Sequence, residues 1–239
     1  MVNRELNIPI SLSKHIMKEK KVSSFRVWLA MKGKYGPFVR VEDFDVDAIV
    51  SLCGFKNSST VYYHLKKLLK WNWVGKGNGK YFLRPMSFLC DKYNIRSGKV
   101  HKVDLLKQLS DIKELLFAMS VKGLIIYRKF VGRKIRRYEQ ADETVYKLQD
   151  YKPSTLSVRL LAQLLGLSVN MVHRLKHRCM DLGYMTREKN SRLVQEFERA
   201  LLHELHFEKL FTELGDLKIR LADDLFPNIN TRVSKAYSV

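Results

Sequence analysis

Residues 158–182 contain two short helical patterns that are separated by only Gly166-Leu167-Ser168. Glycine adopts the left-handed backbone conformation that ends a helix, and serine caps the start of the next helix. Ala162 lies inside the first pattern, where a small side chain lets the second helix approach closely. These residues predict a pair of helices that pack across a tight turn.

The segment 23–85 shows a longer series of elements in a similar order. Its apolar residues change from a helical period to an alternating one near Trp71. The predicted series is a helix that Ser23 or Ser24 caps and that ends near Gly33 or Gly36, an extended piece over residues 38–41, a short helix between a cap at Asp45 or Asp47 and Gly54, a helix over residues 60–70, and a basic hairpin around Gly75–Gly79.

In this order of elements, residues 23–85 resemble the winged-helix form of the helix-turn-helix. Residues 156–192 resemble the helix-turn-helix core of bacterial regulators, with Ala162, Gly166 and Ser168 at the small residue, the turn and the cap. The resemblance implies that a recognition helix enters the major groove and that a wing contacts the backbone or the minor groove. Since the same order returns after about 110 residues, we interpret the two segments as a divergent internal repeat.

The expected fold is mainly α with small β-hairpin wings, an α+β class. Two winged-helix domains are joined by a helical connector and followed by a C-terminal helix over residues 193–226. A long helix is expected from Asp104 to Phe130, which Gly123 either kinks or interrupts. The predicted domains are residues 1–90 with an extended entry, the connector 91–153, the second domain 154–226 with its added helix, and a flexible tail over residues 227–239.

The 239-residue chain carries 44 Lys+Arg against 24 Asp+Glu, a formal net charge of +20. This excess indicates a polyanionic partner, most often nucleic acid and less often an anionic membrane surface. It ends near residue 192, because residues 193–239 hold six basic and eight acidic residues. We therefore expect the DNA-contacting surface before residue 192.

Three cysteines, Cys53, Cys90 and Cys179, lie far apart, which argues against a disulfide framework and a Cys-only zinc site. The first residues carry no apolar signal-peptide core, and the apolar stretch 123–127 is far shorter than the roughly 20 residues of a membrane span. We expect a cytoplasmic protein without membrane contact, associated with the nucleoid, or in the host cytoplasm if a phage encodes it.

The second helix of the pair 158–182 supplies the candidate base-reading residues. Asparagine pairs with adenine and arginine with guanine in the major groove, so Asn170 and Arg174 are expected to read bases. Lys176 and Arg178 are expected nearer phosphates, and Met171, Leu175, Cys179 and Leu182 are expected to be buried. The alternative is a solvated helix face. The candidate set is Ser168, Asn170, His173, Arg174, His177 and Arg178.

In the first segment the helix start favours a phosphate, because its backbone N–H groups are unpaired. The lysine-rich outer face of that helix suggests contact with the DNA backbone more than base reading. The candidate residues are Asn57, Ser59, Thr60, Tyr63, Lys66, Lys67 and Lys70 on this helix, Lys76 and Lys80 on the first wing, Arg187, Lys189 and Arg192 on the second wing tip, and Arg133, Lys134, Arg136 and Arg137 in the connector, where the alternative is again a solvated face.

Signals for an enzyme are weak, and the sequence favours a non-enzymatic protein. His203 and His206 lack the spacing of a zinc protease motif, and the glycines of 75–79 lack the helix entry of a phosphate loop. Asp43, Asp45 and Asp47 fit a cap and loop better than a metal cluster. We expect no metal, no cofactor and no small-molecule effector.

The leading hypothesis is a sequence-specific double-stranded DNA-binding protein. It is either a transcriptional regulator or a replication initiator of a bacterial mobile element or phage, since plasmid and phage initiators are similar in having two tandem winged helices. The alternative is a structural or protein-interaction module of a phage or polymerase assembly. The segment 197–214 either packs on its own domain or joins two copies in a homodimer, and paired half-sites favour the homodimer.

Overall fold

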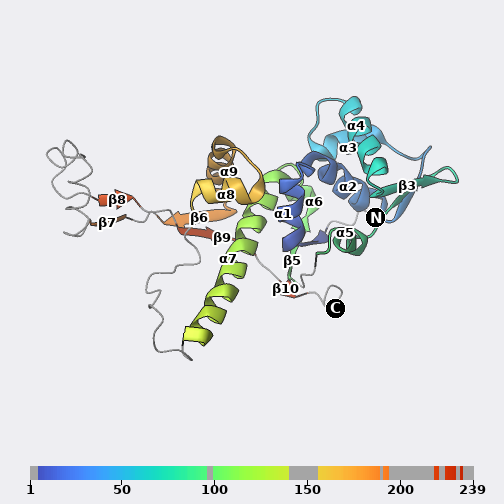
Figure 1. Ribbon diagram of the computed structural model, residues 1–239. Coiled ribbons are helices and arrows are strands. Elements are labelled where there is room, and N and C mark those ends of the chain that lie inside the picture. The colour runs from blue at the N-terminus through green and yellow to red at the C-terminus, as the bar shows by residue number, and fades with distance from the viewer. Residues whose placement is uncertain are drawn as a thin grey trace.

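The computed structural model describes residues 5–95, 99–139, 156–188, 191–193, 218–220, 224–229 and 232–233. The fold of these residues is α+β, in which helices dominate and the sheets are small and antiparallel (Figure 1). Within this part of the chain, every helix is too short or too polar to span a bilayer.

The N-terminal unit consists of three helices and a three-stranded sheet in the predicted order. Asp45 Oδ1 accepts a hydrogen bond from Ala48 N at 2.9 Å, and Gly54 ends that helix with a φ of 63°. Asn57 then caps the following helix. The sheet has the order β2-β4-β3. The elements are α2 (Val22–Tyr35), β2 (Phe38–Arg40), α3 (Val46–Cys53), α4 (Ser58–Lys70), β3 (Val74–Gly77) and β4 (Lys80–Leu83).

The start of α2 differs from the prediction. The helix begins at Val22 with Lys21 at the cap position, so Ser23 and Ser24 lie in its first turn. Ser24 Oγ instead lies 2.9 Å from His64 Nδ1, which connects α2 to α4. The predicted stop at Gly36 is confirmed, since this residue is the C-cap with a φ of 77°.

Residues 5–18 are more regular than the predicted extended entry. Strand β1 (Glu5–Pro9) pairs antiparallel with β5 (Lys99–Asp104), and helix α1 (Ile10–Lys18) follows directly. Pro9 is the N-cap of α1 with an extended backbone, so this proline is compatible with a helix that starts at Ile10. Five α1 side chains are buried at helical spacing: Ile10, Leu12, Ser13, Ile16 and Met17.

Helix α7 (Ile112–Glu139) packs against α1 and against the C-terminal unit, and its last turns project from the body (Figure 1). The expected interruption at Gly123 is absent from this helix. A Cβ at Gly123 would lie 3.0 Å from Ile10 Cγ2, so the glycine lets α1 approach closely. The short helices α5 (Met86–Lys92) and α6 (Leu105–Gln108) precede α7.

The C-terminal unit contains two short helices, of which the first packs on α1 and the second on the start of α7. Ser157 caps the first, Gly166 ends it with a φ of 62°, and Ser168 caps the second. These three positions confirm the predicted turn. The unit comprises α8 (Val158–Leu165), α9 (Val169–Asp181), β6 (Met185–Glu188) and β9 (Asp224–Pro227), beyond which β7 (Ser191–Leu193) pairs with β8 (Lys218–Arg220).

The predicted wing tip at 187–192 and the helix over 193–226 are wrong for the described residues. Strand β6 pairs with β9, so Thr186 lies opposite Phe226, and β7 pairs with β8. Local periodicity does not reveal a pairing between strands this far apart in sequence. Residues 194–217, including the proposed homodimer segment 197–214, lie outside the described residues.

The C-terminal segment also departs from the predicted flexible tail. Strand β10 (Arg232–Val233) pairs with β5, with Arg232 opposite Val100. One continuous apolar core joins the helices of both units, from Ile8 beside α1 through Leu116 on α7 to Leu175 on α9. The two units therefore share a core that α1 and α7 supply.

Candidate nucleic-acid interface

Helix α9 presents a polar face to the surface. Asn170, His173 and Arg174 are exposed, as predicted, and His177 is half-buried with its ring 4.7 Å from that of His173. The opposite face packs on the core through Val172, Leu175 and Cys179. The donors and acceptors that the sequence singled out for base reading thus lie on one side of one helix.

Three predictions for α9 are wrong. Lys176 is only 4% exposed, because it shares the buried face with Val172 and Cys179 at i, i+4 and i+7. It is therefore not a surface lysine for phosphates. Leu182, predicted to be buried, is 40% exposed, and Met171 is half-buried.

The Arg178 side chain forms an ion pair within the protein. Its Nε lies 3.2 Å from Glu114 Oε1 on α7, and Cys179 Sγ donates to the Glu114 carbonyl oxygen at 3.2 Å. The Arg178 side chain remains 63% exposed, whereas that of Glu114 is 6% exposed. The pair fixes α9 on α7 and leaves much of the guanidinium accessible.

The helix starts use their polar side chains as caps. Ser168 Oγ accepts from Met171 N at 3.2 Å. Asn57 Oδ1 accepts from Thr60 N at 3.2 Å and from Thr60 Oγ1 at 2.7 Å. Of the residues predicted at the start of α4, Asn57 and Thr60 form the cap, whereas Ser59 is exposed.

The outer face of α4 combines aromatic and basic side chains. Tyr63 is 56% exposed, Lys66 and Lys70 are exposed, and the Nζ of half-buried Lys67 lies 4.2 Å from the Tyr63 ring centroid. Tyr62 is 53% exposed. This face carries four groups that can donate hydrogen bonds to phosphates: Tyr62, Tyr63, Lys66 and Lys70.

The β3–β4 hairpin carries both predicted wing lysines. Lys76 is exposed, with its Nζ 5.8 Å from the Tyr81 ring centroid, and Lys80 Nζ lies 5.3 Å from that of Phe38. Phe38 and Phe82 lie opposite each other in the register and are 51% and 41% exposed. Sequence reasoning missed this aromatic pair, although both positions alternate with the buried Val39 and Tyr81.

The remaining predicted contacts are only partly described. Arg187 lies in β6, half-buried and opposite Leu225. Arg192 lies in β7, where only its backbone is described, and Lys189 lies outside the described residues. The cluster Arg133, Lys134, Arg136 and Arg137 lies in the last turns of α7, and its side chains lie outside the described set.

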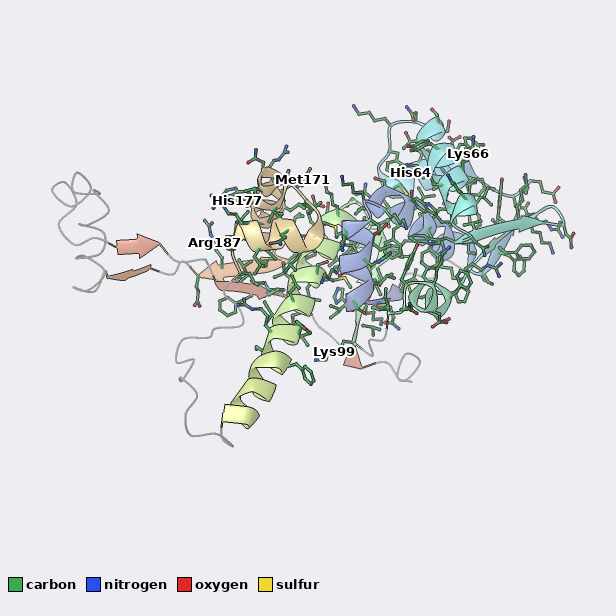
Figure 2. The ribbon with its side chains drawn as sticks, in the orientation of Figure 1. His64, Lys66, Lys99, Met171, His177 and Arg187 are labelled. Atoms are coloured by element: carbon green, nitrogen blue, oxygen red, sulfur yellow. The ribbon has the colours of Figure 1, made fainter. Side chains whose placement is uncertain are left out.

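Helices α4 and α9 lie in the same half of the molecule in the view of Figure 1. Helices α4 and α9 both occupy the upper part of the view in Figure 1, and Figure 2 shows Lys66 and His177 in the same upper half. The shared core of α1 and α7 fixes this arrangement.

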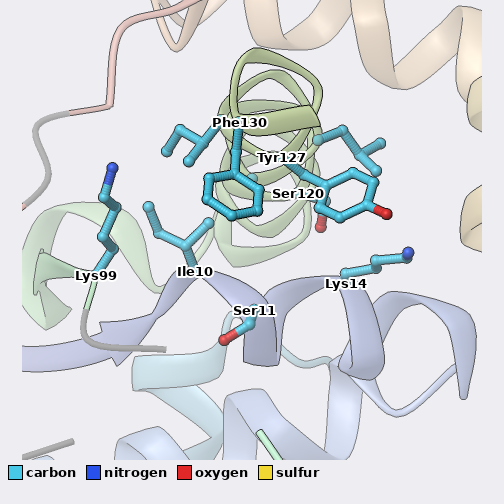
Figure 3. Close-up of a pocket in the computed structure, with 10 residues that line it drawn as sticks. Ile10, Ser11, Lys14, Lys99, Ser120, Tyr127 and Phe130 are labelled. Atoms are coloured by element: carbon cyan, nitrogen blue, oxygen red, sulfur yellow. The ribbon is translucent and has the colours of Figure 1, made fainter. Parts of the chain in front are cut away.

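An apolar cavity of about 570 Å³ lies elsewhere, between α1 and α7. Figure 3 shows Lys14 and Lys99 on opposite sides of its apolar residues Ile10 and Phe130. No local sequence pattern indicates this cavity, because its walls come from α1, α7 and Lys99 of β5, which long-range packing brings together.

The cysteines are buried and protonated. Burial raises the pKa of Cys53 to about 12, of Cys90 to about 11 and of Cys179 to about 12. Such thiols are poor nucleophiles and poor metal ligands. Among the described residues, no three His, Cys, Asp or Glu side chains gather where they could hold a metal ion.

Comparison with known proteins adds no assignment to this geometry. No family model, no curated protein and no solved structure matches the chain. The residues and contacts described above are therefore the basis for assigning a function.

Proposed function

We propose that this chain is a sequence-specific double-stranded DNA-binding protein with two winged-helix modules. The first comprises α2, α3 and α4 with the β2-β4-β3 sheet, and the second comprises α7, α8 and α9 with β6 and β9. The observation that carries the proposal is that the second helix of each turn buries its apolar side and leaves a polar, mostly basic side exposed.

Helix α9 is the proposed base-reading helix. Asn170 and Arg174 lie one turn apart on its exposed side, and neither side chain serves as a cap. Amide and guanidinium groups pair bidentately with adenine and guanine in the major groove. Arg178, tied to Glu114, would hold the helix in register and reach a phosphate with its remaining donors.

Helix α4 is proposed to contact mainly the DNA backbone. Its exposed lysines and tyrosines donate to phosphate oxygens without distinguishing bases. Lys76 and Lys80 extend this basic surface along the hairpin. The formal net charge of +20 supports the same assignment, since charge of this sign strengthens association with a polyanion.

The proposed role is a transcriptional regulator or a replication initiator of a bacterial mobile element or phage. A second candidate is a protein-interaction module of a phage or polymerase assembly. The exposed pair Phe38 and Phe82 favours this candidate, because aromatic side chains of this kind are enriched in protein interfaces.

Selection from a random duplex pool near physiological salt tests the proposal. A recovered consensus supports sequence-specific reading. The matched comparison is Asn170→Ala/Arg174→Ala against Arg159→Ala, which removes an exposed arginine of α8. Binding without a consensus overturns specific recognition, and failure to bind any duplex moves the assignment to the protein-interaction module.

A further inference from the structure

A cavity of about 440 Å³ lies between the two units. One wall comes from the end of α1 and the start of α2, with Lys20, Ser23 and Arg26. The other comes from the α8–α9 turn and α7, with Ser168, Met171 and Lys113. Figure 2 shows Met171 on the side of α9 that faces α4. The cavity therefore lies where the two units meet, beside the start of α9.

The cavity collects positive charge without a compensating carboxylate. Lys20, Arg26 and Lys113 all line it, and none of the described residues that line it is acidic. Lys113 Nζ donates to Met171 Sδ at 3.5 Å, a weak acceptor that leaves the charge in place. Bringing three like charges together is unfavourable, so this site favours a bound anion.

Arg26 connects the cavity to the N-terminal unit. Its guanidinium donates to the Cys53 carbonyl oxygen at 3.1 Å and lies 5.8 Å from the Phe55 ring centroid, beside the turn that starts α4. Its buried Nε has no hydrogen-bond partner among the described residues. A buried donor without a partner is costly, and a ligand oxygen in the cavity would satisfy it.

We propose that this cavity binds a phosphate group of the DNA backbone, where the duplex passes between α4 and α9. The inference rests on the proposed function. A phosphate offers acceptor oxygens in several directions, which suits donors that come from the α1–α2 turn, α2 and α7. The bound phosphate would also link the two units at a point that neither helix face covers.

The test compares wild type with Lys20→Gln, Lys113→Gln and the double variant, using Lys14→Gln in the other cavity as the charge-matched control. Duplex affinity is measured against salt concentration, and thermal unfolding confirms that each variant folds. Because one phosphate is neutralised, the double variant should lower the slope of log affinity against log salt by about one. The control should leave the slope unchanged.

A duplex with one methylphosphonate, scanned along the site, locates the contact. At one position the neutral linkage should weaken binding by the wild type about as much as the double substitution weakens binding to the unmodified duplex. At that position the neutral linkage should not weaken binding by the double variant any further. An unchanged slope, or an equal methylphosphonate loss in both proteins, overturns the proposal.

A measurement with inorganic phosphate distinguishes failure of the proposed phosphate site from failure of the proposed DNA-binding function. Thermal unfolding is measured in phosphate and in chloride at equal ionic strength. If the wild type binds no duplex, DNA binding itself fails and the backbone is excluded as the ligand. Stabilisation by phosphate that the double variant loses would then assign the cavity to a free phosphate compound. Absence of both effects overturns the site altogether.

Discussion

Arg178 on α9 pairs with Glu114 on α7, with 3.2 Å between Nε and Oε1. The carboxylate is nearly buried and the guanidinium is mostly exposed, so this ion pair lies at the edge of the core and holds α9 on α7. Its position makes α7, predicted as a connector, the support on which the proposed base-reading helix lies.

Replacing Arg178 alone should lower the free energy of unfolding more than replacing both Arg178 and Glu114. Arg178→Ala leaves the Glu114 carboxylate buried without its partner, so we expect a loss of about 1–3 kcal/mol in the free energy of unfolding. Adding Glu114→Gln should recover part of that loss. Urea unfolding of both singles and the double variant measures the coupling. Arg174→Ala, at an exposed position of the same helix, is the control. An equal loss in its free energy of unfolding would contradict a stabilising role of the Arg178–Glu114 pair.

The left-handed turn at Gly166 should tolerate asparagine better than alanine. Its φ is 62°, and a Cβ there would make only ordinary contacts with Lys18, so the cost lies in the backbone. We expect Gly166→Ala to lower the free energy of unfolding by about 1 kcal/mol and Gly166→Asn by less. Gly54→Ala is the matched variant in the N-terminal unit, with a φ of 63°. No loss for Gly166→Ala would contradict this explanation of the turn.

Arg174 should contribute to sequence preference and not only to affinity. If it reads a base, Arg174→Ala should cost about 1–3 kcal/mol on the preferred duplex and relax the preference at one position. Competition between preferred and random duplexes measures this, with Arg159→Ala as the control. An equal loss on both duplexes would remove Arg174 from base reading.

Stability should fall at mildly acidic pH because of His64. Burial lowers its pKa, and the charges of Lys67 and Arg26 lower it further. The unfolded chain therefore binds more protons as the pH falls through the ordinary histidine value of about 6.5, and the free energy of unfolding decreases. Above that pH, His64 is neutral in both states and the effect vanishes.

Urea unfolding of His64→Gln at a series of pH values checks this assignment. The variant should show a shallower loss between about pH 7 and 5 than the wild type. His15, whose pKa burial also lowers, should account for part of the slope that remains. Identical pH dependence in the two proteins would exclude His64 as a source.

Local signals were sufficient for much of the fold. The caps at Asp45, Asn57 and Ser168 and the left-handed glycines 54 and 166 act through neighbours three or four residues away. The sequence therefore predicted both helix pairs and the first hairpin. The exposure of Asn170 and Arg174 followed from the same helical period.

Long-range packing accounts for what the sequence did not show. The pairing of β6 with β9 joins residues about 40 positions apart, and no local pattern encodes it. Lys176 is buried because it lies on the side of α9 that buries Val172 and Cys179, whereas the sequence suggested a buried side that includes Met171. The cationic cavity joins Lys20 to Lys113 across the two units, and no local pattern shows that these two residues come together.

The most direct test is a change of spacing within the selected DNA site. If α4 and α9 are held by one core and contact one duplex, inserting 5 base pairs between their contacts turns one of them to the opposite face, since a turn takes about 10 base pairs. Affinity should fall to that of one module, and Lys66→Gln/Lys70→Gln should then have no further effect. Undiminished affinity for the lengthened site, with the α4 lysines still contributing, would contradict the shared framework.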